Sequence, residues 1–267
     1  MILCALKVGE NMSINVKKQT IEEKLNNKVE VRYFETIDST NNEAKRCCEE
    51  LKDTPILFVA DHQTNGRGRL SRSFYSPKNT GLYMSLLLKI DESNSDIVCM
   101  TTATAVCVTR AIKKLTVLSP MIKWVNDIYI NDKKVCGILC EAITNPNTSK
   151  ISAIVVGIGI NINTEDFPKE IKNIAGSLDT NIDSDELCAH ITNNIIEMFS
   201  NLKSREFIDE YKAQSMVLNK EINYIENGIT KSATAIDIDK NGGLVINENG
   251  MTKTLSTGEI SIRMKGN

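Results

Sequence analysis

The chain has 267 residues, of which 41% are hydrophobic and 25% charged, a composition typical of a globular protein and not of a disordered one. A formal net charge of -2 and a pI near 5.9 exclude the broadly basic surface that general nucleic-acid or anionic-membrane binding requires. No apolar run approaches the length of a membrane span, and the N-terminal stretch MILCALKVGEN lacks the basic leader and apolar length of a signal peptide.

Eight cysteines are scattered along the chain, and none forms a CxxC pair. Because the only histidines are His62 and His190, a zinc site is not expected. Cys136 and Cys140 should face the same side of one predicted strand. We therefore expect free, buried thiols and a cytoplasmic location.

The first 29 residues are polar and are predicted to be irregular. Thr40, with Glu43 three residues later, matches a capping box at the start of a helix. In chain order we expect a strand, this helix, and two strands, the first of them buried: VRYFETI, DSTNNEAKRCCEELK, PILFVADHQ and TGLYMSLLLKI.

The middle of the chain predicts a core helix and a hairpin. The segment from Asp96 to Leu115 is apolar on nearly all sides, as a helix inside the core would be. MIKWVNDIYI and KKVCGILCEAI flank an Asn131-Asp132 turn and predict two paired strands. One further strand and two helices follow: ISAIVVGIGININ, SDELCAHITNNIIEMFSNL and REFIDEYKAQS.

Past Ser215, short β-like runs recur every eight to ten residues, separated by the turn signals NG, NGG, NG and TG. This pattern predicts a small all-β barrel of about 50 residues. The fold class is therefore α+β with an added β-barrel. We expect an N-terminal extension, a main domain and the barrel at residues 1–29, 30–214 and 215–267.

The stretch QTNGRGRLSRSF, called the arginine loop below, follows a predicted buried strand and contains Gly66, Gly68, Arg67, Arg69 and Arg72. The glycines let the backbone approach a ligand, and the arginines can bind phosphate or carboxylate oxygens through paired hydrogen bonds. Taken alone, the stretch equally fits an exposed basic turn or an RG-type RNA contact.

Three other motifs are each open to a structural interpretation. KWVNDIYINDKKVCGI places Lys123, Asn126, Asp127 and Lys134 on the two arms of a hairpin, where charged residues usually face solvent. GIGININ lacks the spacing of a dinucleotide-binding fingerprint and fits a glycine-containing core strand. In DSTN, the hydroxyl residues fit plain helix N-caps.

The motifs DSTN, QTNGRGR, F.SP, LY.S, KW.ND, KK..GIL.E and GIGININ, followed by a small β-barrel, together resemble the biotin–protein ligase family over about Val31 to Met264. The resemblance implies a class II synthetase-like catalytic domain, a mixed sheet with helices, and an SH3-like C-terminal barrel. It also implies that biotin is activated with ATP and Mg²⁺ to biotinyl-5′-adenylate. The biotinyl group is then transferred to a lysine of a biotin carboxyl carrier protein of the acetyl-CoA or pyruvate carboxylase type.

The same resemblance assigns roles by position. It implies that the catalytic residues are Arg67, Arg69, Lys134 and Asp127, with Asp127 receiving the incoming lysine. The biotin contacts it implies are Ser39, Thr40, Asn41, Gln63, Gly66, Arg67, Lys134 and Gly137. The nucleotide contacts it implies are Arg67, Arg69, Arg72, Asn126, Lys134 and Asn161. No side chain is assigned to the metal, since Mg²⁺ would be bound by the ATP phosphates. The arginine loop is expected to be flexible until it closes over the adenylate, and Phe167 or a neighbour is a candidate adenine cover.

The sequence departs from the family pattern at three positions. Val125 replaces proline, Phe74 replaces tryptophan, and Cys136 replaces a small residue, which is expected to narrow the pocket and confer sensitivity to thiol reagents. Residues 1–29 are too few for a winged helix-turn-helix, so no DNA binding is expected. The alternatives are a lipoate–protein ligase, a non-catalytic sensor of biotin or adenylate, and an RNA-binding module. A homodimer is left open.

Overall fold

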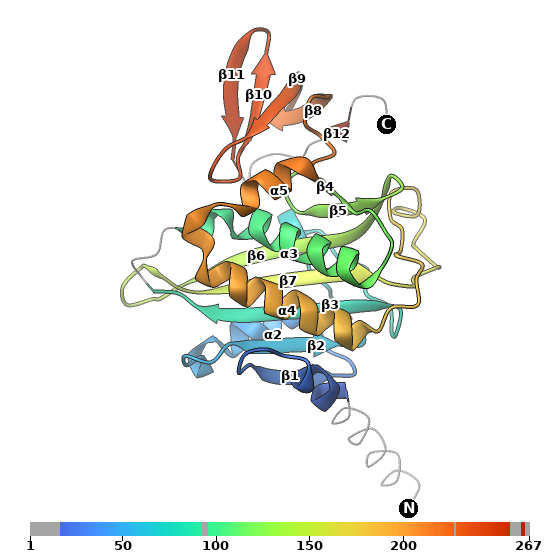
Figure 1. The fold of residues 1–267 in the computed structure, drawn as a ribbon, viewed down its shortest axis with the longest axis vertical. Helices are drawn as coiled ribbons and strands as arrows, with labels where there is room; N and C mark the ends of the chain where they lie inside the picture. The colour runs from blue at the N-terminus through green and yellow to red at the C-terminus, as the bar shows by residue number, and fades with distance from the viewer. Residues whose placement is uncertain (1–16, 92–95, 227, 257–262, 265–267) are drawn as a thin grey trace, which may run out of the picture.

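The computed structural model describes residues 17–91, 96–226, 228–256 and 263–264. Its main feature is a seven-stranded mixed sheet with the order β1-β2-β3-β7-β6-β5-β4, in which β1 and β2 are parallel and all other neighbours antiparallel (Figure 1). The strands are β1 (Glu30–Phe34), β2 (Ile56–Ala60), β3 (Gly81–Lys89), β4 (Met121–Lys123), β5 (Asp127–Ile130), β6 (Lys133–Thr144) and β7 (Ile151–Asn161).

Helices cover both faces of this sheet, which explains why β2, β3 and β7 are buried along most of their length. Helices α3 (Met100–Leu115) and α4 (Ser184–Ser200) cover one face and form the larger core (Figure 1). Helix α2 (Thr40–Arg46) packs on the opposite face over a smaller core. Helix α5 (Phe207–Ala213) leads to the C-terminal sheet. Short 3₁₀ segments occur at Cys48–Glu50, Arg69–Ser71, Asp96–Cys99 and Leu202–Ser204.

The start of α2 corrects one prediction. Ser39 is the N-cap residue and makes no side-chain capping hydrogen bond, so the capping box is wrong. The Glu43 carboxylate accepts a hydrogen bond from Arg46 at 2.7 Å instead of reaching back to the helix start. The Thr40 hydroxyl is directed into a buried polar network, described below. The helix also ends at Arg46, well before the end of the predicted segment.

The N-terminal prediction is also wrong where the structure describes it. Residues 17–23 are helical, and Ile21 is fully buried in the larger core. Lys17 pairs with Asp61 at 2.7 Å, just beyond the end of β2. Ile21 and Leu25 lie four residues apart and both pack in the larger core, so the prediction of an irregular segment overlooked a short apolar stripe at helical spacing.

The predicted strand MIKWVNDIYI is broken into β4, a turn at residues 124–126 and β5, and the two strands pair antiparallel. The peptide bond between Trp124 and Val125 is cis. The next turn was predicted correctly: Asn131 and Asp132 both have positive φ angles, of 48° and 61°, and connect β5 to β6. Such angles favour asparagine and aspartate among non-glycine residues.

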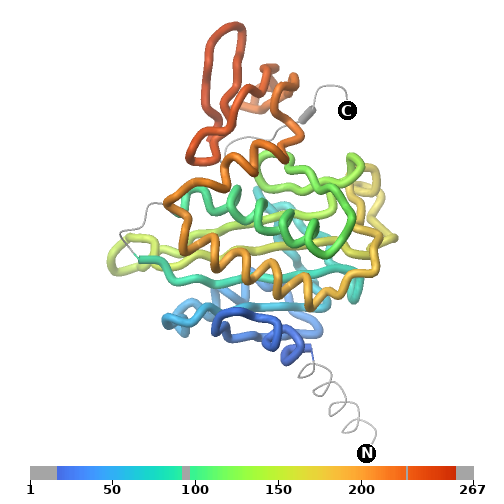
Figure 2. Tube along the Cα trace, in the orientation of Figure 1, coloured from blue at the N-terminus to red at the C-terminus, as the bar shows by residue number. Residues whose placement is uncertain are grey.

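The predicted all-β unit is confirmed as a separate antiparallel sheet with the order β11-β10-β9-β8-β12. In both ribbon and tube it lies beyond the β4 edge of the large sheet, with β1 at the far edge (Figures 1 and 2). Its strands are β8 (Glu221–Glu226), β9 (Ile229–Ile238), β10 (Leu244–Glu248), β11 (Met251–Leu255) and β12 (Arg263–Met264). Among the described helices, none has the length and apolar character needed to span a membrane.

Candidate active site

A cavity of about 790 Å³ lies on the α2 side of the large sheet. It is enclosed by the arginine loop, the β4–β5 turn, strands β6 and β7, and residues 167–175. Six lining residues are cationic and only two are carboxylates, so the cavity is locally positive within a chain of net charge -2. The cations are Arg67, Arg69, Arg72, Lys123, Lys133 and Lys134, and the carboxylates are Asp127 and Asp132. This imbalance favours an anionic ligand.

Glycines on β7 let other side chains pack directly on the strand. A Cβ atom at Gly157 would lie 1.9 Å from the Asn41 Oδ1 atom, and one at Gly159 would lie 2.5 Å from the Phe74 ring. Gly137, on neighbouring β6, faces the same ring and the Lys134 side chain. The glycine-rich motif therefore forms a cavity wall against which an amide and an aromatic ring rest.

A polar network occupies the end of the cavity next to α2. The Gln63 Oε1 atom accepts hydrogen bonds from the Thr40 amide at 2.9 Å and the Thr40 hydroxyl at 3.2 Å. Its Nε2 atom donates to Ser76 at 2.9 Å. The Ser85 hydroxyl lies 2.7 Å from the Thr40 Oγ1 atom and 2.6 Å from the Asn41 Oδ1 atom. Ser76 and Ser85 fall within the F.SP and LY.S motifs of the family resemblance, but the sequence assigned neither a role, because nothing in a loop or an apolar strand shows what a single serine contacts.

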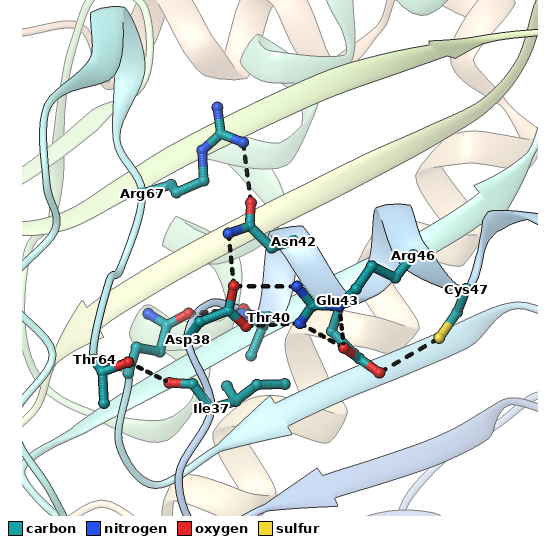
Figure 3. Close-up of polar contacts among 10 residues, drawn as sticks. Ile37, Asp38, Thr40, Asn42, Glu43, Arg46, Cys47, Thr64 and Arg67 are labelled. Atoms are coloured by element: carbon teal, nitrogen blue, oxygen red, sulfur yellow. Dashed lines mark hydrogen bonds and ion pairs between the residues drawn. The ribbon is translucent and has the colours of Figure 1, made fainter.

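The Arg67 side chain does not join the other predicted clamp residues. Its Nη1 atom donates to Asn42 Oδ1 at 3.0 Å, and its Nη2 atom lies 3.4 Å from Glu141 Oε1. Figure 3 shows the guanidinium directed at Asn42, whose amide in turn donates to Asp38. The arginine loop is therefore attached to helix α2 through Arg67.

Glu141, on β6, is a site residue that the sequence reasoning missed. Its carboxylate accepts hydrogen bonds from Lys45 at 2.6 Å and Asn41 at 2.9 Å, in addition to the Arg67 contact. Burial raises the pKa of Glu141, but these donors and the two cations lower it by more, so its pKa lies below the ordinary value. The motif GIL.E contains this residue, yet only the fold brings helix α2 to it.

Arg69 lies at the opposite wall, where its Nη1 atom donates to Asn126 Oδ1 at 3.0 Å. Burial lowers the pKa of its guanidinium, and the nearby Asp127 carboxylate opposes that effect in part. An arginine stays protonated despite such a shift, so Arg69 is a desolvated cation. Asn126 is itself fixed, because its Nδ2 atom donates to the Ile138 carbonyl at 2.9 Å.

Asp127 and Lys134 form an ion pair of 2.7 Å between β5 and β6. The predicted cluster of Lys123, Asn126, Asp127 and Lys134 is therefore brought to one side of the cavity, where all four line it. Three strands carry the cluster instead of the two arms predicted, because β4 and β5 are separate.

The remaining predicted residues are placed as follows. Ser39 and Arg72 both line the cavity. The Ser39 side chain is buried, whereas Arg72 is exposed. Gly66 has no room for a side chain, because a Cβ atom would lie 2.4 Å from the Phe74 carbonyl oxygen. Asn161 lines the cavity and donates to the Gly176 carbonyl at 2.9 Å. Its buried Oδ1 atom has no hydrogen-bond partner among the described residues.

The arginine loop has hydrogen bonds of its own. The Gly68 amide donates to the Arg72 carbonyl at 2.7 Å, and the Phe74 amide donates to the Gly66 carbonyl at 2.9 Å. Its tip exposes Leu70. Phe167 also lines the cavity, with its ring centroid 6.4 Å from that of Tyr75.

The expectation for Cys136 is wrong. Its side chain is fully buried in the larger core, on the face of β6 opposite the cavity, because side chains alternate along a strand. Burial raises the pKa of its thiol. Cys136 therefore neither narrows the cavity nor offers a reactive thiolate. No disulfide joins any two of the seven cysteines in the described part of the chain, and Cys4 lies outside it.

Two family models match the chain. Residues 33–161 match the Biotin/lipoate A/B protein ligase family, and residues 217–263 match the Biotin protein ligase C terminal domain. The chain belongs to the biotin protein ligase family. The two matched segments contain the arginine loop, the KW.ND motif, the GIGININ motif as far as Asn161, and the C-terminal sheet as far as Arg263, in the order predicted.

Relatives and solved structures agree with this membership. The chain is 39% identical over 148 residues to the Bifunctional ligase/repressor BirA of Bacillus spizizenii, covering 55% of this chain but only 45% of that protein. It is 26% identical to the protein of the same name in Escherichia coli, over 87% of this chain and 74% of that protein. The biotin protein ligase of Aquifex aeolicus, solved in complex with biotin and ATP, superposes with a TM-score of 0.76. It is 29% identical, and the match covers 88% of this chain and 99% of that one.

Proposed function

We propose that the protein activates biotin with ATP to biotinyl-5′-adenylate and transfers the biotinyl group to a lysine of a biotin carboxyl carrier protein. The observation that carries this proposal is the positive cavity wall, where Arg69 and the Asp127–Lys134 pair lie beside Asn126. Adenylation brings a carboxylate against an α-phosphate, and fixed cations offset the repulsion between these anions.

Biotin fits the other part of the cavity. Its ureido group requires both donors and acceptors, and the network around Ser39, Thr40, Asn41 and Gln63 has both, held in place by Ser85. Its largely apolar ring system packs in this proposal against the Phe74 ring, which lines the cavity and itself rests on the glycines of β6 and β7. In this arrangement the biotin carboxylate points toward Lys134 and the cationic wall. Gly137 lines this space, whereas Gly66 is buried and does not line the cavity.

The nucleotide occupies the cationic side in this proposal. Arg69, Arg72 and Lys134 bind phosphate oxygens, and the unpaired Asn161 Oδ1 atom is an acceptor for an adenine N–H. In the described residues no three histidine, cysteine, aspartate or glutamate side chains lie close enough together to bind a metal ion. Mg²⁺ would therefore be bound mainly by the ATP phosphates, where it neutralises charge.

Asp127 serves the second step. A free lysine amine has a pKa of about 10.4 and arrives protonated. The Asp127 carboxylate attracts this ammonium and accepts its proton, and Lys134 moves from Asp127 to the anionic adenylate.

We also propose the division into an N-terminal extension, a catalytic domain at residues 30–214 and a barrel at residues 215–267. The free thiols favour a reducing compartment, and we propose the cytoplasm. The carrier would be a carboxylase subunit or domain of the acetyl-CoA or pyruvate type. The lack of DNA binding and of a repressor role stays a prediction, as does the oligomeric state.

The deciding experiment is ATP–pyrophosphate exchange by the purified protein with Mg²⁺, comparing biotin, lipoate and no acid. Exchange with biotin alone is the expected result. Exchange with lipoate alone would assign the protein to the lipoate branch of the family. Measurable biotin binding without exchange would identify a sensor and remove the catalytic roles of Arg67, Arg69 and Lys134.

A further inference from the structure

The turn between β4 and β5 carries two cavity residues, Asn126 and Asp127, and is held from two directions. Toward the large sheet, Asn126 exchanges hydrogen bonds with Ile138 of β6, at 2.9 and 3.0 Å. On the other side, contacts to the turn come from later in the chain. The Tyr211 hydroxyl, on α5, donates to the Val125 carbonyl at 3.2 Å.

A second contact from later in the chain joins the turn to the C-terminal sheet. The Trp124 Nε1–H group donates to the carbonyl of Gly242 at 2.8 Å, and both residues are buried. Gly242 lies in the turn between β9 and β10, so the bond connects residues 118 positions apart. Trp124 also lines the cavity, so one indole touches both the ligand space and the C-terminal sheet.

The β9–β10 turn has a defined shape that presents this carbonyl. The Asp239 carboxylate accepts hydrogen bonds from the amides of Asn241 and Gly243, both at 2.8 Å. Gly242 has a φ angle of +83°, and a Cβ atom there would lie 2.8 Å from the side chain of the buried Thr102 on α3. A side chain at position 242 would therefore be strained and would push the turn away from α3.

We infer that the β9–β10 turn is a positioning element of the active site, acting through Trp124 to fix Asn126 and Asp127. The inference rests on the proposed function and assigns a task in it to the C-terminal sheet. Arg69 is coupled to the same β4–β5 turn, because its guanidinium donates to Asn126. Displacement of that turn thus moves two groups together: Arg69, which we propose binds phosphate, and Asp127, which we propose receives the carrier lysine. Small displacements of such groups lower reaction rates strongly.

Gly242→Ala perturbs this contact without altering a residue of the cavity. Gly250→Ala is its matched control. Gly250 also lies in a turn of the same sheet and has a positive φ angle of +88°, but a Cβ atom there would have no neighbour within 4 Å. Both substitutions impose the same backbone strain. Only the first disturbs the contact with Trp124.

Three measurements are made on the full chain: fluorescence emission of Trp124, biotin dissociation constant, and kcat of ATP–pyrophosphate exchange. Because Trp124 is the chain's only tryptophan, its emission reports this contact directly. For Gly242→Ala we expect a shifted emission and a kcat lowered at least about tenfold, with the biotin dissociation constant changed less than about threefold. Gly250→Ala should match the wild type in all three.

Equal behaviour of the two glycine variants overturns the inference. If Gly242→Ala fails to fold, Trp124→Phe takes its place, since it keeps an aromatic ring and removes the N–H donor. Trp124→Phe with wild-type kcat would also overturn it, and a lowered kcat with retained biotin binding would support it. Absence of exchange in the wild type refutes the proposed function instead, and the emission comparison then still tests the contact.

Discussion

Glu141→Gln tests whether the carboxylate of Glu141 attaches the arginine loop to helix α2. One carboxylate oxygen accepts from Lys45 at 2.6 Å and the other from Asn41 at 2.9 Å. A glutamine has one oxygen and one NH₂ group, so in either orientation one of these donors would face another donor. The Arg67 ion pair, at 3.4 Å, would lose its charge partner as well.

The expected cost follows from these contacts. A hydrogen bond to a charged group contributes about 1.5–3 kcal/mol when buried, and a partly exposed ion pair contributes less. Since Glu141 is 18% exposed and Lys45 is 34% exposed, we expect a loss of about 2 kcal/mol in the free energy of unfolding. For a domain of this size that corresponds to a fall in Tm of about 4–8 °C.

The pH dependence has a definite sign. Because the folded-state pKa of Glu141 is lowered, its stabilisation is complete above the unfolded-state value of about 4.3 and is lost as pH falls through the folded-state pKa. Thermal unfolding by circular dichroism should thus show the full Tm difference between wild type and Glu141→Gln at pH 7, and a shrinking difference below pH 4. Asp53→Asn, which breaks an exposed pair with Lys89, is the control and should leave Tm unchanged.

A Tm loss of less than about 1 °C at pH 7, or a loss that does not change with pH, would refute this reasoning. A double-mutant cycle with Lys45→Met separates the ion pair from packing and should give a coupling energy of about 1 kcal/mol. Release of Arg67 should also raise the KM for biotin more than it lowers kcat, because the arginine loop forms one wall of the cavity in which we propose that biotin binds.

Three further predictions concern the cavity. Asp127→Asn should leave biotin-dependent pyrophosphate exchange largely intact and slow single-turnover transfer to a carrier domain by about 100-fold, and equal loss in both assays would contradict its role. Gly159→Ala should displace the Phe74 ring and weaken biotin binding about tenfold by calorimetry; an unchanged dissociation constant would show that the wall tolerates a methyl group. Cys136 should react with iodoacetamide in the native protein much more slowly than half-buried Cys48, as mapped by mass spectrometry, and equal labelling would contradict its burial.

The sequence alone determined most of the large sheet, the core helix and the family. Strands such as Ile56–Ala60 and Gly81–Lys89 are largely apolar because helices cover both faces, and this pattern is visible locally. The Asn131-Asp132 turn was also predictable, since few residues adopt its backbone angles. The order of short polar motifs between these elements indicated the family before any contact was known.

Tertiary structure alone decided which side chains meet. Glu141 meets Lys45 across 96 positions and Trp124 meets Gly242 across 118, and no local period or propensity encodes such pairs. The same reason explains the errors. The capping box failed because Thr40 is bound to Gln63 and Ser85, and the irregular N-terminal prediction failed because Ile21 is buried by the larger core. Local sequence determines which elements form, whereas their packing determines the partners of each polar side chain.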